Sequence, residues 1–315
     1  MKIKRLPRSL RFGGTPLHHG ISQPFPPEPD GVRRINERCI ELDTYLNLTQ
    51  GGSAGLIGVT LFISPIICIS AGIIAGLTIG INKEILNGML ITMPVLPCMA
   101  LIFYYAGGAH RCRGAFVRIN RITRKVYFIP PKTPNKMLIF DWDQIEGIAG
   151  FIPIVTAHTY TSRHPLYLIG IDYSVSPPTE LCVACGNLGV IDGSRSARTL
   201  WAYLQHFMAY GPERLPAPPP LPAKLSRREA AIQPYRQWLV DFKKELCQPY
   251  GWLKAPITIP VQLTLCLLYA CLNSSEAWIQ YNVPYVAFPH ANDVLCGFAE
   301  KRKPVIRVNG IRQEN

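Results

Sequence analysis

Two long apolar runs dominate the pattern of hydrophobic and polar positions in the first third of the chain. Residues 54–82 contain no charged side chain, and a second uncharged run extends from Ile85 to His110. Each run exceeds the roughly 20 apolar residues that a helix needs to cross a bilayer. Only a short polar link separates the runs, so the sequence predicts an antiparallel transmembrane hairpin over residues 51–110. The alternative is a pair of buried helices in a soluble core, which charge-free runs of this length do not favour.

Glycines in and just before the first run form two clusters with a spacing of about four: Gly51, Gly55 and Gly58, and then Gly72, Gly76 and Gly80. Such spacing lets helices pack closely in a membrane, which here predicts contact between the two spans. Pro65, Pro94 and Pro97 fall inside the runs. Membrane helices tolerate proline where neighbouring groups satisfy the freed carbonyls.

After the second run the pattern changes to a period of two, which is typical of strands. Residues 111–211 contain roughly six or seven short strands of this type between proline-rich loops. The clearest are AFVRIN, KVYFI, MLIFDWD, LYLIGID and ELCVAC. An amphipathic helix follows, which Ser194 or Ser196 is expected to cap and Gly211 to end. Its apolar stripe consists of Ala197, Leu200, Trp201, Leu204 and Met208.

The predicted fold is therefore a membrane α-helical hairpin plus an α+β body. Successive strands without intervening helices favour an antiparallel sheet or half-barrel. Closure of the half-barrel by one C-terminal amphipathic helix resembles a pleckstrin-homology-like (PH-like) fold.

The remaining segments flank these two regions. Residues 1–50 are predicted to be an N-terminal cytosolic leader, and the proline-rich residues 212–225 a semi-rigid linker. Residues 226–315 form a helical and apolar C-terminal region that opens with the capping box Ser226–Glu229 and is interrupted at Pro234. Its first helix either lies on the membrane as a basic amphipathic helix or packs on the sheets. The uncharged residues 255–275 are expected to be buried or re-entrant rather than a third span.

Charge sets the orientation of the hairpin. The net charge is +13, which suits an anionic membrane surface, nucleic acid or an acidic partner. The apolar runs favour lipid, and no nucleic acid is expected because exposed aromatics do not interleave the basic residues. Basic residues cluster just after the second run: Arg111, Arg113, Arg118, Arg121, Arg124 and Lys125. By the positive-inside rule, both termini of this multi-pass protein are expected to be cytoplasmic. Its expected location is the inner membrane. The cluster is expected to bind the membrane surface or to act only as a topology signal.

Residue types that carry chemistry are sparse and scattered. Cys182 and Cys185 form a C-x-x-C pair without a second ligand pair, which indicates structural thiols. His18, His19, His158 and His164 lie apart in the sequence, except for the first two. Asp141 and Asp143 could share a strand face as paired carboxylates, but more often such residues end a strand and cap the next turn. The sequence therefore predicts no catalytic site, no cofactor and no metal.

Two tryptophans are candidate contacts for a partner. Trp142 and Trp201 are of the residue type that is enriched at interface hot spots. The alternative is that they pack between the sheet and the amphipathic helix.

Three motifs together resemble a known family. They are RINRITRKVY after the second run, FDWDQIEG at residues 140–147 and ARTLWAYLQHFMAYGPERLP at residues 197–216. This combination is similar to an uncharacterised family of bacterial two-span membrane proteins, often encoded beside type VI secretion or polymorphic-toxin genes. The family pattern would continue with Trp-Pro and a nearby acid, where this chain has Phe288-Pro289-His290.

The resemblance implies a setting of antagonism or self-protection and carries no catalytic residues. The expected function is that of a membrane-anchored binding protein whose partners are the bilayer and a protein. The first hypothesis is an immunity or accessory protein that binds a type VI toxin or secretion component. The second is a membrane scaffold or sensor, and the third is a membrane enzyme or pore component.

Overall fold

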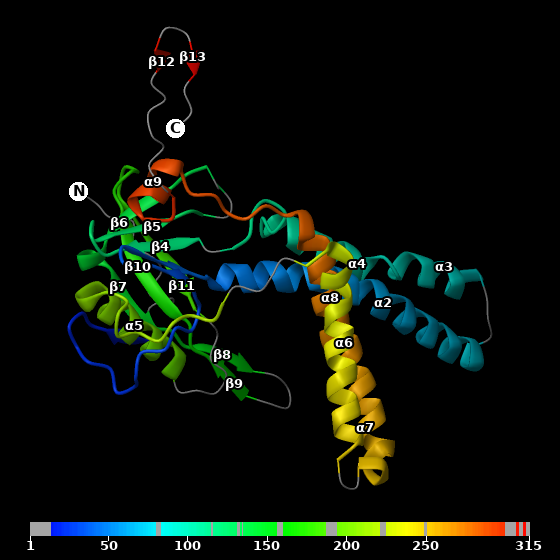
Figure 1. The fold of residues 1–315 in the computed structure, drawn as a ribbon. Coiled ribbons are helices and arrows are strands. Elements are labelled where there is room, and N and C mark those ends of the chain that lie inside the picture. The colour runs from blue at the N-terminus through cyan, green and yellow to red at the C-terminus, as the bar shows by residue number, and fades with distance from the viewer. Residues whose placement is uncertain are drawn as a thin grey trace.

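The computed structural model describes most of the chain. The described residues are 14–79, 83–114, 116–130, 133, 135–155, 160–186, 194–220, 225–248, 251–299, 307–308 and 311–312. They form a body of two sheets and one helix, from which two groups of helices project in different directions (Figure 1).

The body consists of two antiparallel sheets that pack face to face. The first has the order β2-β3-β4-β5-β6, with strands at Val32–Ile35, Cys39–Leu42, Val117–Asn120, Lys125–Phe128 and Leu138–Asp141. The second has the order β1-β7-β10-β11, with strands at Thr15–Leu17, Glu146–Ala149, Leu166–Asp172 and Thr179–Cys185. Two small hairpins pair β8 (Ile152–Val155) with β9 (Tyr160–Arg163) and β12 (Arg307–Val308) with β13 (Ile311–Arg312). The predicted antiparallel body is confirmed, but its sheets are open and do not close into a barrel.

One face of each sheet supplies the core. On the first sheet, Ile40 and Leu42 of β3 face inward with Val117 and Ile119 of β4. Helix α5 (Arg195–Tyr210) covers the second sheet, and the predicted stripe on this helix is buried throughout. Gly147 lies under the ring of Trp201, where a Cβ atom would come within 2.8 Å of the indole. This close approach lets α5 lie flat on β7.

The two ends of α5 are formed differently from each other. Gly211 ends the helix with a φ of 88°, a left-handed conformation that glycine adopts without steric cost. Ser194 precedes the helix but its side chain makes no capping hydrogen bond. The prediction of the helix end is confirmed, whereas the predicted cap at Ser194 is wrong.

The segment predicted as a leader is part of the body. Residues 15–42 supply β1, β2 and β3, so the sheets combine strands from both sides of the apolar hairpin. Strands β3 and β4 pair directly, with Leu42 opposite Val117. The apolar helices are therefore an insertion between two neighbouring strands, and both ends of that insertion meet the body at one place.

The inserted helices are α2 (Tyr45–Ile79), α3 (Lys83–Thr92) and α4 (Val95–Ala106). In a regular helix, the backbone N–H of residue 97 would donate to the carbonyl of Met93. Pro97 has no N–H, so that carbonyl lacks its helical partner. The Ser64 hydroxyl on α2 donates to that carbonyl instead. The break between α3 and α4 is thus satisfied from the neighbouring helix.

The glycines of α2 serve two different neighbours. Gly72 contacts Met89 of α3, as the hairpin prediction requires. Gly51, Gly55 and Gly58 instead contact Glu276, Leu272 and Ser275 of α8 (Cys271–Ile279). The first glycine cluster, Gly51 to Gly58, therefore packs against α8. The sequence analysis did not predict this contact with a C-terminal helix.

The C-terminal region begins with a second helical hairpin. Helix α6 (Arg227–Leu246) starts at the predicted capping box and runs through Pro234 without interruption. Helix α7 (Gly251–Leu265) returns beside it and continues through the π-helical turn η2 (Cys266–Ala270) into α8. Of the two alternatives predicted for residues 255–275, burial within the protein is wrong, because Ile257, Val261, Leu263 and Tyr269 are all more than half exposed. A re-entrant segment stays a prediction.

The chain then returns to the body. The short helix η3 (Gln280–Asn282) leads to a backbone bridge between Tyr285 and Arg113. Helix α9 (His290–Leu295) lies on the outer face of the first sheet, near β4 and β5 (Figure 1).

Candidate functional site

The α2–α4 insertion exposes apolar side chains instead of burying them. Two helical segments are long and apolar enough to cross a membrane, Gly51–Thr78 and Leu86–Ala106. Only 28% and 6% of their most apolar stretches are buried in the molecule. A core helix of a soluble protein would be mostly buried, so this surface is matched to an apolar surrounding.

The predicted basic cluster divides into three environments. Arg111 is exposed and Arg113 is half-buried over the ring of Tyr285, both close to the end of α4. Arg118 is only 3% exposed and points away from solvent. The other three residues, Arg121, Arg124 and Lys125, lie around the turn at the far end of β4, about 13 Å from the start of that strand at 3.3 Å per residue. The six residues do not form one continuous surface.

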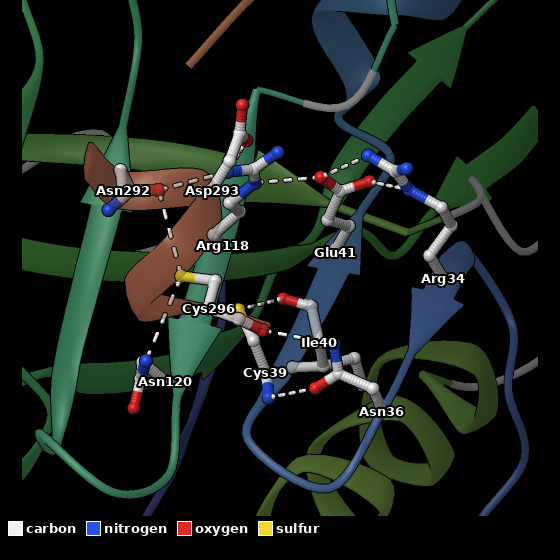
Figure 2. Close-up of polar contacts among 10 residues, drawn as sticks. All are labelled: Arg34, Asn36, Cys39, Ile40, Glu41, Arg118, Asn120, Asn292, Asp293 and Cys296. Carbon is white, nitrogen blue, oxygen red and sulfur yellow. Dashed lines mark hydrogen bonds and ion pairs between the residues drawn. The ribbon is translucent and has the colours of Figure 1, made fainter. Parts of the chain in front are cut away.

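Arg118 instead belongs to a row of charges across the first sheet (Figure 2), in which Arg118 and Glu41 are buried and Arg34 is exposed. Its Nε donates to Glu41 Oε1 at 2.7 Å, and Arg34 Nε donates to Glu41 Oε2 at 2.6 Å. The three residues occupy paired positions on β2, β3 and β4. Hydrogen bonding to Glu41 raises the pKa of Arg34.

The C-terminal segment closes over this row. Arg118 Nη1 donates to Asp293 Oδ1 at 2.6 Å and to Asn292 Oδ1 at 3.0 Å. The guanidinium carbon of Arg118 lies 3.9 Å from the centroid of the Phe288 ring. Phe288 and Asp293, both of the C-terminal segment, thus contact the same guanidinium. Arg118 and Glu41 can remain charged in a buried place because they pair with each other, and each also pairs with a partly exposed charge, Asp293 or Arg34.

Two thiols lie within the same contact region. Cys39 of β3 and Cys296 after α9 are both fully buried; Cys39 Sγ donates to the Ile40 carbonyl at 3.7 Å and Cys296 Sγ to Asn292 Oδ1 at 3.6 Å. Burial raises the pKa of Cys39, whereas the neighbouring Cys39 thiol lowers that of Cys296, aided by Asn120 and Arg118. The Asn36 amide donates to the Cys296 carbonyl at 2.9 Å (Figure 2). The region joins α9 to the sheet and offers no thiol to solvent.

The two candidate tryptophans lie in the core. Trp142 is 2% exposed and Trp201 is fully buried, and their rings stack at a centroid distance of 5.5 Å. His19 packs against both rings at 5.2 and 5.0 Å. Packing between sheet and helix is the alternative that this geometry supports, since both indoles are buried and stack on each other.

The remaining candidates for chemistry are ordinary structural groups. Asp141 pairs with Lys125, and Arg124 Nε donates to Asp143 Oδ2 at 2.9 Å, which lowers the pKa of Asp143. His164 is buried against the carbonyl of Gly150, and His158 lies outside the described residues. Cys182 and Cys185 are not joined by a disulfide bond. No group of three or more potential metal ligands occurs in the described part of the chain.

A cleft of about 500 Å³ opens beside α5. Its lining includes His19, Arg124, Trp142, Asp143 and His206. The His206 Nε2 atom is buried and has no hydrogen-bond partner among the described residues. The lining is aromatic and mixed in charge, which suits binding of a polar group more than a reaction.

Comparison with known proteins gives one family. A model described as a family of unknown function, DUF6708, matches residues 93–278, more than half of the chain. The chain belongs to this family. The DUF6708 match includes Arg118 but ends before Asp293 and begins after Glu41. Neither a curated protein nor a solved structure gives a match.

Sequence reasoning missed the partners of Arg118 in this DUF6708 protein. Glu41 and Asp293 are separated from Arg118 by 77 and 175 positions, so no local pattern joins them. The available signals were the short alternating runs VRRI and CIEL, and an acid placed shortly after Phe288-Pro289. The two runs lie in the segment that was predicted to be a leader. The acid follows Phe288-Pro289-His290, where the resemblance predicts Trp-Pro.

Proposed function

We propose that the chain is a non-catalytic binding protein anchored in the bacterial inner membrane by α2–α4. The observation that carries this proposal is the exposure of apolar side chains along the inserted helices. They include Leu61, Phe62, Ile66, Ile67, Ile73, Ile74 and Leu77 on α2. The corresponding side chains on α3 and α4 are Leu86, Leu90, Ile91, Ile102 and Phe103.

The pairing of β3 with β4 supports a hairpin with the body on one side of the membrane. Because both ends of the insertion meet the body together, an even number of crossings is required. Arg111 and Arg113 follow α4 directly, whereas the described start of α3 carries Lys83 beside Glu84. By the positive-inside rule, the body and both termini then lie in the cytoplasm.

The body is the part that binds a protein partner. Its successive antiparallel strands and single covering helix α5 support a PH-like half-barrel with open sheets. The resemblance to proteins encoded beside type VI secretion and toxin genes supports an immunity or accessory role, exerted by stoichiometric binding. A scaffold or sensor is the alternative, and the cleft beside α5 favours it as a place where a cytosolic partner could be held.

Two experiments test this function. Alkaline extraction of isolated membranes should leave the full-length protein in the pellet, and release into the supernatant would contradict the anchor. Co-expression with the product of the adjacent gene should then restore growth if that product is toxic, with co-purification in detergent. A harmless neighbour, or killing that continues, would reject the immunity role and leave the scaffold.

A further inference from the structure

The hairpin of α6 and α7 has almost no core of its own. None of the side chains of α6 is buried, and Ala255 is the one buried residue among the side chains described on α7. Large apolar side chains are exposed along both helices: Tyr235, Leu239, Val240, Ile257, Ile259, Val261 and Leu263. Something outside the described molecule must cover a surface of this kind if it is to be stable.

The two helices differ in what they expose. Gln262 of α7 faces α6, since its carbonyl accepts a 3.0 Å hydrogen bond from Trp238 Nε1. Positions 257, 260, 261 and 264 lie on the other half of α7, and Lys254 is the helix's one charged residue. The exposed side chains of α6 are largely charged: Arg228, Glu229, Arg236, Asp241, Lys243 and Lys244. The hairpin is therefore amphipathic as a unit: α7 is its apolar layer, and α6 is its charged layer despite the exposed Tyr235, Leu239 and Val240.

Helix α8, which follows the α6–α7 hairpin, contacts the membrane anchor at the end of α2 nearest the body. Helix α8 crosses α2 at Gly51, Gly55 and Gly58, at the end of α2 nearest the body. Tyr104 of α4 packs at the same level, in a cluster with Ala54 and Ile57 against which Ile279 also packs. Tyrosine is enriched where a membrane helix passes through the headgroup region. From this level α6 and α7 run across the direction of α2 rather than along it (Figure 1).

We propose that α6 and α7 lie in the plane of the cytoplasmic leaflet, with α7 at the boundary of headgroups and acyl chains and α6 toward water. The partner is an anionic phospholipid surface. This inference rests on the membrane anchoring proposed above and extends it to a second, in-plane contact. Amphipathic helices with cations on the polar side bind membranes in this way.

Charge favours lipid over a second copy of the chain. The residues near the tip include Lys243, Lys244 and Lys254 against Glu245. Two copies packed through their tips would bring like charges together, whereas anionic headgroups attract each lysine. Helix α7 also continues through η2 into α8, which packs directly on α2.

Site-specific photocrosslinking tests the assignment on the full-length protein. A benzoylphenylalanine replaces Ile257 or Val261, which are 74% and 51% exposed, so neither change disturbs a buried contact. Ile73 on α2 and Ile122 on the body are the matched controls, at 57% and 64% exposed. The protein is reconstituted in phosphatidylcholine vesicles that contain phosphatidylglycerol. We expect lipid adducts at Ile257 and Val261 within about twofold of the yield at Ile73, and none at Ile122.

The controls separate the two proposals. Lipid adducts at Ile73 without adducts on α7 would overturn the in-plane contact and leave the anchor intact. Absence of adducts at Ile73 as well would overturn the anchor. A crosslinked product of doubled mass at Val261 would show that a second copy covers α7, which also overturns the inference.

The contribution of charge has its own test. The double substitution Lys243→Gln/Lys244→Gln should lower the lipid adduct at Val261 about threefold or more in anionic vesicles. The matched control Lys136→Gln removes a half-exposed lysine from the body and should leave that yield unchanged. Equal yields for both variants would reject the role of anionic lipid.

Discussion

The body and the α2–α4 insertion place the same residue types in opposite surroundings. In the body, Ile40, Ile119 and Trp201 are fully buried, and the charges of Glu41 and Arg118 are buried with them as a paired row. In the insertion, Ile67 and Ile73 are more than half exposed, and the described spans carry no charge. The body is built to fold in water, whereas the insertion matches a medium in which apolar side chains face outward. Single substitutions in the body and in the insertion can test this difference.

The largest expected effect follows from removing the buried charge at the centre of the row. Arg118→Met leaves Asp293 and part of Glu41 without their cation, and losing one partner of a buried pair costs about 3–5 kcal/mol. Arg124→Met removes an ion pair whose side chains are half exposed, which costs about 1 kcal/mol or less. Thermal unfolding in detergent, followed by tryptophan fluorescence, compares the two variants. Equal shifts in the unfolding midpoint would show that the Arg118 row does not stabilise the body.

The next effect tests the insertion. Ile67→Arg places a cation near the middle of α2, where insertion into a bilayer costs about 2.5–3.5 kcal/mol. Ile122→Arg makes the same change at an exposed position on the body, between β4 and β5. We expect the first variant to lose much of its resistance to alkaline extraction and the second to retain it. If both variants stay in the membrane pellet to the same extent, α2 does not face lipid at this position.

A smaller effect concerns the contact between the insertion and the C-terminal helices. A Cβ atom at Gly55 would lie 2.7 Å from Leu272 Cγ, whereas one at Gly52 would meet nothing within 4 Å. Gly55→Val should therefore displace α8 at a cost of about 1–3 kcal/mol, and Gly52→Val should not. Limited proteolysis of α6–α8 in detergent measures the difference. Similar cleavage rates in the two variants would mean that the close approach of α8 to α2 is not needed for its docking.

The same contrast explains what could be predicted from the sequence. The insertion was found because absence of charge over a long run is a local property that needs no partner. The strands after residue 116 and the stripe of α5 were found because their periodicity is also local. Strands β2 and β3 were missed because each is four residues long and the pairing partner β4 lies beyond the whole insertion.

Arg118 shows the limit most clearly. The positive-inside rule counts cations near a span regardless of what they pair with, so Arg118 was grouped with its exposed neighbours. Its burial depends on Glu41 and Asp293, which approach it only when the two ends of the chain meet on the first sheet. Likewise, the glycines at the start of α2 signalled a close helix contact but could not say which helix makes it.

The smallest expected effect is a pH dependence at the α2–α8 contact. Burial raises the pKa of Glu276, although Arg113 acts in the opposite direction. A raised carboxyl pKa gives stability that is fully present below the unfolded value of 4.5 and is lost as the pH rises through the folded value. Glu276→Gln keeps a neutral side chain, so the variant should match the wild type in acid and exceed it in stability near neutral pH.

Glu229 is the matched control because its shift has the opposite sign. Hydrogen bonds from Ser226 lower the pKa of Glu229, so its contribution is present above pH 4.5 and is lost as the pH falls through the lowered value. Glu229→Gln should therefore reduce stability slightly near neutral pH and converge with the wild type in acid. Unfolding midpoints of both variants in detergent, measured from neutral to acid pH, test this reversal. If Glu276→Gln and Glu229→Gln shift the midpoint in the same direction at neutral pH, Glu276 is not destabilised by burial against α2.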